Sequence, residues 1–207
     1  MRAYTHIAVE GIDGCGKGTQ TQLLVEHLTR AGFDARLVRE PTDGPIGQLI
    51  REQLIAPTIS EVELNVLFAA DRIIHCMMMA RQADARDKQG GEGELVFVSD
   101  RSVWSSYAYH GVDNPAHAHI SPENTRPDFT VVIDLDPGLA LNRMLSRDDA
   151  QPDRFENFER MSSAREAYVT LCERHPDRLG LVDGDGSIYS VADAVTARVD
   201  QWLTTGR

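Results

Sequence analysis

Short apolar runs alternate with longer amphipathic stretches along this chain of 207 residues. Apolar runs bounded by turn residues predict buried strands, and stretches with helical periodicity predict helices. We expect strands at residues 5–10, 35–39, 95–98, 129–135 and 180–183. We expect helices at residues 19–31, 46–54, 61–89, 103–109, 137–146, from the charged segment near 154 to 173, and from 187 or 190 to 203. This alternation predicts an α/β fold, with a parallel sheet of about five strands and helices on both of its faces.

Local signals support several of these boundaries. Ser60 and Glu63 have the spacing of a capping box at the start of the long helix. Pro137 suits the first turn of a helix, and Gly32 follows the end of the first helix. Residues 110–127 contain turn-forming residues and three histidines, and we expect a long loop there. The sequence shows neither internal repeats nor a linker, so we expect a single domain over residues 1–207.

A glycine-rich segment joins the first predicted strand to the first predicted helix. In a phosphate-binding loop of this kind, backbone N–H groups and a helix N-terminus surround an anion, while a lysine reaches the outer phosphates. The usual pattern places Ser or Thr directly after the lysine, but here Gly18 follows Lys17 and Thr19 comes next, so we expect Thr19 near the phosphates and Mg²⁺. A glycine-rich turn that binds no ligand is the alternative. The residues expected to bind ATP here are Gly11, Asp13, Gly14, Cys15, Gly16, Lys17, Gly18 and Thr19.

The composition narrows the class of protein. The net charge of -11 argues against a nucleic-acid-binding protein, which usually carries a basic excess. Cys15, Cys76 and Cys172 form no disulfide or metal-binding pattern, so we expect free thiols in a reducing compartment. We interpret Cys15 as a small residue that fits the loop; the alternative is a thiol whose pKa is lowered by Lys17 and the nearby helix start. Since the sequence shows no signal peptide and no long apolar run, we expect a cytoplasmic protein with neither a membrane nor a nucleic acid as its partner.

Asp100 and Arg101 directly follow a predicted buried strand. An acid in this position holds Mg²⁺ in phosphate-loop enzymes, and the guanidinium of a neighbouring arginine pairs well with phosphate. An exposed ion pair is the alternative. Ligands of parallel sheets bind at the carboxyl ends of the strands, where Glu40-Pro41 and Asp183 also lie. The sequence therefore predicts a phosphate and metal site at this edge.

The long predicted helix carries a second candidate site. Phe68 and Arg72 are four residues apart, so they share one face of the helix. A ring and a guanidinium on one face suit a nucleobase and a phosphate, and a core phenylalanine with a solvated arginine is the alternative. Residues 73–79 are apolar on all sides, which indicates burial in the core or, for part of the segment, at a subunit interface.

Arginines flank a charged loop in the last third of the chain. Arg143, Arg147 and Arg154 surround several aspartates, and a mobile loop of this kind can close over transferring phosphates. We expect a short lid at about residues 147–155, with a solvated surface loop as the alternative. We expect no metal site among the histidines of the long loop, which are His110, His117 and His119.

These segments together resemble the thymidylate kinases, the phosphate-loop enzymes that phosphorylate dTMP. The resemblance covers nearly the whole chain, and the order and spacing of the segments are more specific than any single motif. The matching segments are residues 10–14 with Gly16-Lys17, residues 39–41, residues 67–72, Asp100-Arg101 with Ser105, Ser106 and Tyr109, residues 153–156, and Val182-Asp183 with Ser187. The resemblance implies a P-loop kinase-type fold, ATP and dTMP as substrates, Mg²⁺ as the cofactor, and a homodimer.

The resemblance also implies roles for individual residues. Phe68 would stack on thymine, and Arg72 would contact the base or its phosphate. Arg101 would bind the acceptor phosphate, and Asp13 would face the monophosphate near the sugar. The other residues implied to bind the acceptor are Glu40, Pro41, Arg51, Ser105, Ser106 and Tyr109. Asp183 and Ser187 would border the adenine of ATP, and the implied metal ligands are Thr19 and Asp100.

The implied reaction is in-line transfer of the γ-phosphoryl group of ATP to dTMP. Because glycine stands at position 14, the resemblance implies that a lid arginine acts in catalysis. The implied catalytic residues are Lys17, Asp13, Arg101, Arg147 and Arg154. Two alternatives stay open. Gly18-Thr19 resembles the loop of adenylate and UMP/CMP kinases, which indicates another nucleoside monophosphate kinase; a regulatory NTP-binding module is the other alternative, although such a module needs no second anion site.

Overall fold

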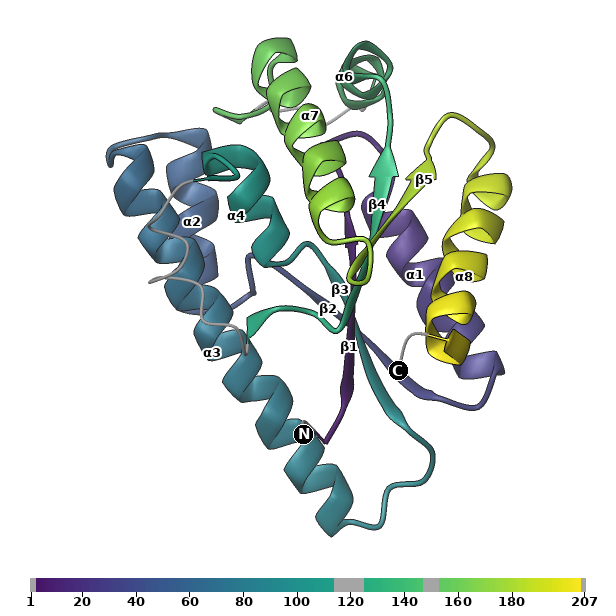
Figure 1. Cartoon of the computed structure of the whole chain (residues 1–207). Helices are drawn as coiled ribbons and strands as arrows, with labels where there is room; N and C mark the ends of the chain where they lie inside the picture. Colours follow the sequence, from purple (N-terminus) through teal and green to yellow (C-terminus); the bar gives the residue numbers. More distant parts are fainter. Residues whose placement is uncertain (1–2, 114–124, 147–152, 206–207) are drawn as a thin grey trace.

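The computed structural model describes residues 3–113, 125–146 and 153–205 of the chain. Five strands form one parallel sheet in the order β2-β3-β1-β4-β5, which confirms the expected α/β fold (Figure 1). The strands are β1 (Thr5–Glu10), β2 (Asp34–Arg39), β3 (Leu95–Asp100), β4 (Phe129–Asp134) and β5 (Leu179–Asp183). The helices are α1 (Lys17–Arg30), α2 (Pro45–Ile55), α3 (Glu61–Lys88), α4 (Val103–His110), α6 (Pro137–Leu145), α7 (Phe158–Arg174) and α8 (Ile188–Thr205).

Helices cover both faces of the sheet (Figure 1). On one face α1 packs against α8, which also contacts β4 and β5. On the other face lie α3, α4 and α7, with α2 against α3 and α6 against α7. The central strands β1, β3 and β4 are buried along most of their length because helices cover both of their faces, whereas the edge strand β2 is partly exposed.

The local signals in the sequence act as expected. The Ser60 hydroxyl accepts a hydrogen bond from the Glu63 N–H at 3.3 Å, and the Glu63 carboxylate accepts one from the Ser60 N–H at 2.9 Å, which completes the capping box. Pro137 lies in the first turn of α6. The first helix begins at Lys17, two residues before the predicted start, because Gly16 adopts a φ of 100° and turns the chain directly into the helix.

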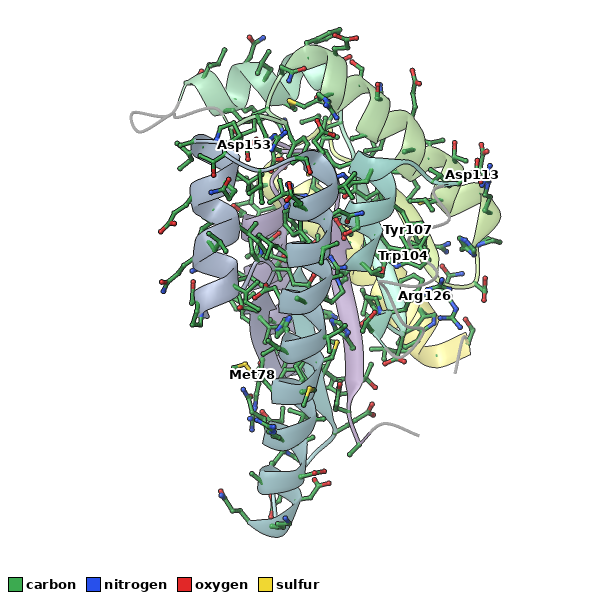
Figure 2. The ribbon with its side chains drawn as sticks, turned by 90° about the vertical axis from the view of Figure 1, so that its left-hand side faces the viewer. Met78, Trp104, Tyr107, Asp113, Arg126 and Asp153 are labelled. Carbon is green, nitrogen blue, oxygen red and sulfur yellow. The ribbon has the colours of Figure 1, made fainter. Side chains whose placement is uncertain are left out.

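The apolar segment 73–79 differs from its prediction. His75 and Met79 are buried, but the other large apolar side chains of the segment are between 38% and 50% exposed. The exposed side chains are Ile73, Ile74, Met77 and Met78. The core interpretation is therefore wrong for these four residues, because one side of α3 faces the sheet and the other side is exposed in the described part of the chain. Figure 2 shows Met78 on this outer side of the long helix.

The register of the strands aligns their carboxyl ends. Asp100, the last residue of β3, pairs with Val9 of β1 and with Arg39 of β2. The segments that follow these three strands therefore gather at one edge of the sheet. They contain the glycine-rich loop, Glu40 and Arg101.

Some predictions fall outside the described residues. The structure does not describe residues 147–152, which hold Arg147 and most of the predicted lid. It also does not describe residues 114–124, which hold His117 and His119. The division into one domain over residues 1–207 stays a prediction. Over the ranges that the structure describes, every helix is too short or too polar to cross a lipid bilayer.

Candidate active site

The glycine-rich loop packs tightly against the end of β4 and against α6. A Cβ atom at Gly11 would lie 2.6 Å from the carbonyl oxygen of Ile133, and one at Gly14 would lie 2.2 Å from that of Ala140. Both glycines also have a positive φ, so the loop requires glycine at these positions. Gly16, the residue before α1, offers no side-chain cap, which leaves the first N–H groups of the helix free for an anion.

Lys17 is held within this loop. Its side chain is 6% exposed, and its ammonium group donates to the Ile12 carbonyl at 2.9 Å and to Asp13 Oδ1 at 3.4 Å. The positive charge therefore lies beside the free helix N-terminus, as a phosphate-binding loop requires. The alternative interpretation of Cys15, a thiol of lowered pKa, is wrong. Burial raises the pKa of the Cys15 thiol and outweighs the nearby charge of Lys17.

Asp100 faces the first turn of α1. A Cβ atom at Gly18 would lie 3.3 Å from Asp100 Oδ2, so Gly18 stands opposite this carboxylate. The other oxygen, Asp100 Oδ1, is buried and has no hydrogen-bond partner. A carboxylate oxygen without a partner beside a phosphate-binding loop fits a hard cation such as Mg²⁺. Thr19 and Asp100 line one cavity together, and the role of Thr19 as a metal ligand stays a prediction.

Arg101 joins the two halves of the site. Its guanidinium donates through Nη1 to Ser105 Oγ at 3.0 Å and through Nη2 to Asp13 Oδ1. Tyr109 donates its hydroxyl to Asp13 Oδ2 at 3.2 Å. Burial alone would raise the pKa of Asp13, but the charges of Arg101 and Lys17 outweigh it and hold this pKa well below its usual range. Asp13 is therefore ionised and oriented by three donors.

Two cavities meet at Asp13 and Arg101. The first has a volume of about 140 Å³. It is lined by Asp13, Pro41, Leu54, Phe68, Arg101, Ser105, Ser106, Tyr109, His110, Asp153 and Phe155. The other has a volume of about 400 Å³ and is lined by Asp13, Gly14, Gly16, Lys17, Gly18, Thr19, Arg39, Glu40, Pro41, Arg51, Asp100 and Arg101. The first cavity is rich in aromatic rings, the second is rich in phosphate-binding groups, and Asp13, Pro41 and Arg101 line both.

Arg72 is buried beside the aromatic cavity, with 2% of its side chain exposed. It donates through Nε to Glu40 Oε2 at 2.8 Å and through Nη2 to Ser106 Oγ at 3.1 Å. His75 Nδ1 lies 3.3 Å from Glu40 Oε1. Burial would raise the pKa of Glu40, but Arg72 and His75 outweigh it and lower this pKa. The alternative of a solvated arginine is therefore excluded. Arg72 Nη1 is buried without a partner, which leaves one donor for a ligand.

Besides Gly11, Cys15 and Arg72, three other predicted residues line neither cavity: Arg154, Asp183 and Ser187. Arg154 lies 5.6 Å from the Phe155 ring, and its Nη2 is 3.7 Å from Glu61 Oε1, so in this structure it points toward the start of α3. Asp183 is the last residue of β5, and Ser187 lies just beyond it at the same edge of the sheet, where the Ile188 carbonyl accepts a hydrogen bond from the Gln20 side chain of α1 at 2.9 Å. Contacts of these three residues with ATP stay predictions.

The structure adds aromatic and acidic groups that the sequence reasoning did not assign to the site. Phe155 and His110 line the aromatic cavity with ring centroids 5.7 Å apart, and the Phe68 ring is 6.4 Å from His110. Asp153 lines the same wall, near the end of α2 (Figure 2). Burial, with a smaller contribution from the Asp13 charge, raises the pKa of Asp153. Residues 153–156 were noted as a matching segment, and this was the available signal. Within the described residues, His, Cys, Asp and Glu form no group of three placed to hold a metal.

Comparisons with known proteins agree with this site. The family model described as thymidylate kinase matches residues 9–195. A probable thymidylate kinase of Methanosphaera stadtmanae is 35% identical over 205 residues, which cover 96% of this chain and 98% of that protein. A thymidylate kinase of Caldanaerobacter subterraneus subsp. tengcongensis is 32% identical over 95% of both chains. The parallel sheet, the phosphate-binding loop and these matches along nearly the whole length agree, and the chain belongs to the thymidylate kinase family.

Proposed function

We propose that this protein transfers the γ-phosphoryl group of ATP to the 5′-phosphate of dTMP, giving ADP and dTDP. The observation that carries the proposal is the pair of cavities that share Asp13, Pro41 and Arg101. Transfer between two nucleotides needs a phosphate cradle for the donor and a base pocket for the acceptor, with their reactive ends adjacent. The two cavities have this arrangement.

On the donor side, the free N–H groups at the start of α1 and the ammonium of Lys17 would hold the ATP phosphates. Asp100, with its unpartnered Oδ1, and Thr19 would hold Mg²⁺. Bound Mg²⁺ would neutralise charge on the donor phosphates. Asp183 and Ser187 would lie near the adenine.

On the acceptor side, Phe68 would stack on the thymine ring and the free Nη1 of Arg72 would donate to the base. Ser106 and Tyr109 line the same cavity and would lie near the base and the sugar. The remaining acceptor contacts would come from Glu40, Pro41, Arg51 and Ser105. Arg51 lines the phosphate cavity and donates to the Pro41 carbonyl at 3.1 Å, so its charge would lie at the junction of the two substrates.

The chemistry needs no protein nucleophile, because the acceptor phosphate already supplies an anionic oxygen. Catalysis is then positioning and charge stabilisation. Arg101 would offset the repulsion between the donor and acceptor phosphates, and Asp13 would hold its guanidinium. A lid arginine, Arg147 or Arg154, would stabilise the charge of the phosphoryl group in transit, a contribution that reaches about 10³-fold in related chemistry.

The test is ADP formation from ATP and Mg²⁺ with dTMP, dUMP, UMP, CMP, AMP and GMP offered separately. We expect a strong preference for dTMP. A preference for AMP or UMP would mean that the Gly18-Thr19 loop was the better guide to the acceptor. ATP turnover that is independent of any acceptor, or no turnover, would favour the regulatory module. Lys17→Met serves as the inactive control, because it removes the charge from the phosphate-binding loop.

A homodimer formed through α3 is the second part of the proposal. The exposed Ile74 and Met78 line a groove with Leu37 and Ile46, and these four apolar side chains come from three neighbouring elements. Apolar patches of this kind mark protein interfaces. Light scattering is expected to show a dimer for the native chain and a monomer for Met78→Glu. The matched control is Leu145→Glu, which places the same charge at a 55% exposed leucine of α6.

A further inference from the structure

Glu10 is the last residue of β1 and is fully buried. Its carboxylate accepts five hydrogen bonds from three residues. Oε1 accepts from the Ser102 N–H at 2.7 Å, the Ser102 hydroxyl at 2.9 Å and the Ser105 N–H at 3.1 Å. Oε2 accepts from the Ser105 hydroxyl at 2.8 Å and the Tyr168 hydroxyl at 2.7 Å. A buried carboxylate is costly unless such donors surround it, so this group has a specific use.

The first use concerns the backbone around Arg101. Among the described residues, Arg101 is the one non-glycine residue with a positive φ, 72°. This conformation is strained for a side chain of this kind and persists only where its neighbours hold it. The Arg101 N–H donates to the Val9 carbonyl at 3.1 Å, and the next N–H, of Ser102, donates to Glu10. Consecutive peptide groups are therefore anchored on the end of β1.

The second use concerns the Arg101 side chain. The Ser105 hydroxyl has one proton, which it donates to Glu10, so its oxygen presents a lone pair to Arg101 Nη1 at 3.0 Å. Tyr168 reinforces this orientation, since burial and the Glu10 charge raise the pKa of its phenol and keep it a donor. Glu10 thus determines the direction of the Ser105 hydroxyl proton, and the Ser105 oxygen fixes Nη1 of the Arg101 guanidinium. Asp13 accepts from Nη2.

We propose that Glu10 is a positioning residue for phosphoryl transfer, which with Ser105 and Tyr168 fixes the backbone and side chain of Arg101 at the junction of the two cavities. This inference rests on the proposed role of Arg101. Glu10 lines neither cavity, so it acts through Arg101 and not through a substrate.

The test begins with Glu10→Gln, which keeps the size of the side chain and one acceptor oxygen. The new NH₂ group donates to the Ser105 hydroxyl, whose proton must then leave this position and turn toward Arg101 or toward the Tyr168 hydroxyl 3.1 Å away. We expect kcat to fall about 10- to 100-fold, the range for a misplaced catalytic group, with the KM for ATP within about twofold of the native value. Tyr168→Phe is expected to have a smaller effect of the same kind. Glu166→Gln makes the same charge change at an exposed position of α7 and is expected to leave kcat unchanged.

A double-mutant cycle separates positioning from general stability. In an Arg101→Ala background, Glu10→Gln is expected to change the residual kcat by less than about twofold, because the residue that it positions is gone. Losses that multiply in the double variant would overturn the inference, and so would a native kcat in Glu10→Gln. If Arg101→Ala itself kept native activity, the proposed function of Arg101 would fail instead. Thermal unfolding checks the fold, and if Glu10→Gln does not fold, the same cycle with Tyr168→Phe decides the matter.

Discussion

Replacing Phe68 by alanine removes one wall of the aromatic cavity, which we propose binds the acceptor. The ring also packs on a small cluster formed by Ile50, Leu64 and Phe155. Stacking of a base on an aromatic side chain contributes about 1–3 kcal/mol, which corresponds to an increase of about 5- to 140-fold in the KM for dTMP. Because Phe68 is only partly buried, we expect its loss to destabilise the fold by less than the ~3–5 kcal/mol of a core phenylalanine.

The assay is steady-state ADP formation with dTMP varied at saturating ATP and Mg²⁺. The lost stacking weakens the ground state and the transition state alike, so the KM for dTMP should rise while kcat changes little. The KM for ATP should stay constant, because Phe68 lines the aromatic cavity and does not line the phosphate cavity. Two further variants separate stacking from volume. Phe68→Tyr keeps the ring and should behave like the native protein, and Phe68→Leu keeps an apolar side chain without the ring and should behave like alanine.

The control is Phe158→Ala, which removes a 57% exposed ring outside both cavities and should leave both KM values unchanged. Thermal unfolding must show that each variant is folded at the assay temperature. A folded Phe68→Leu protein with a native KM for dTMP would refute the stacking role. The base would then contact another wall of the cavity.

Three further predictions concern charge. The cations beside Asp13 outweigh its burial and lower its pKa. Its ionised form therefore stabilises the fold above about pH 4, and this stabilisation is lost below that value. Urea unfolding should show that Asp13→Asn is less stable than the native protein at neutral pH, with the difference shrinking below about pH 4. Asp153 has a pKa raised by burial and should behave oppositely: Asp153→Asn should be more stable than the native protein at neutral pH, and a difference that persisted below about pH 4 would contradict the cause. Gly18→Ser places a hydroxyl beside Asp100 and should lower the Mg²⁺ concentration for half-maximal activity, a gain that Asp100→Asn should abolish.

Features that depend on neighbours in the sequence were predictable. The strands are apolar runs, and all five lie within two residues of their expected bounds. The capping box of Ser60 and Glu63 needs residues three apart, and the phosphate-binding loop needs glycines beside a lysine and a following helix. In each case the local backbone conformation follows from the residue types themselves.

The order of the strands and the pairs at the site required the tertiary structure. Arg101 meets Asp13 across 88 positions, and Glu10 meets Tyr168 across 158. Such pairs form because β1 and β3 are neighbours in register and because α7 packs against α4, and neither fact leaves a local signal in the sequence.

Residues 73–79 show the same limit from another side. The sequence established that this segment is apolar on all sides, but periodicity does not distinguish a side chain that the sheet covers from one left on the surface. The packing of α3 decided the matter, with His75 and Met79 buried and Met78 exposed. The sequence by itself determined which segments are strands and helices and where the glycine-rich loop lies, because these depend on short-range backbone and side-chain preferences. The packing of helices on the sheet decided which side chains line the aromatic cavity, since that packing joins residues far apart in the chain.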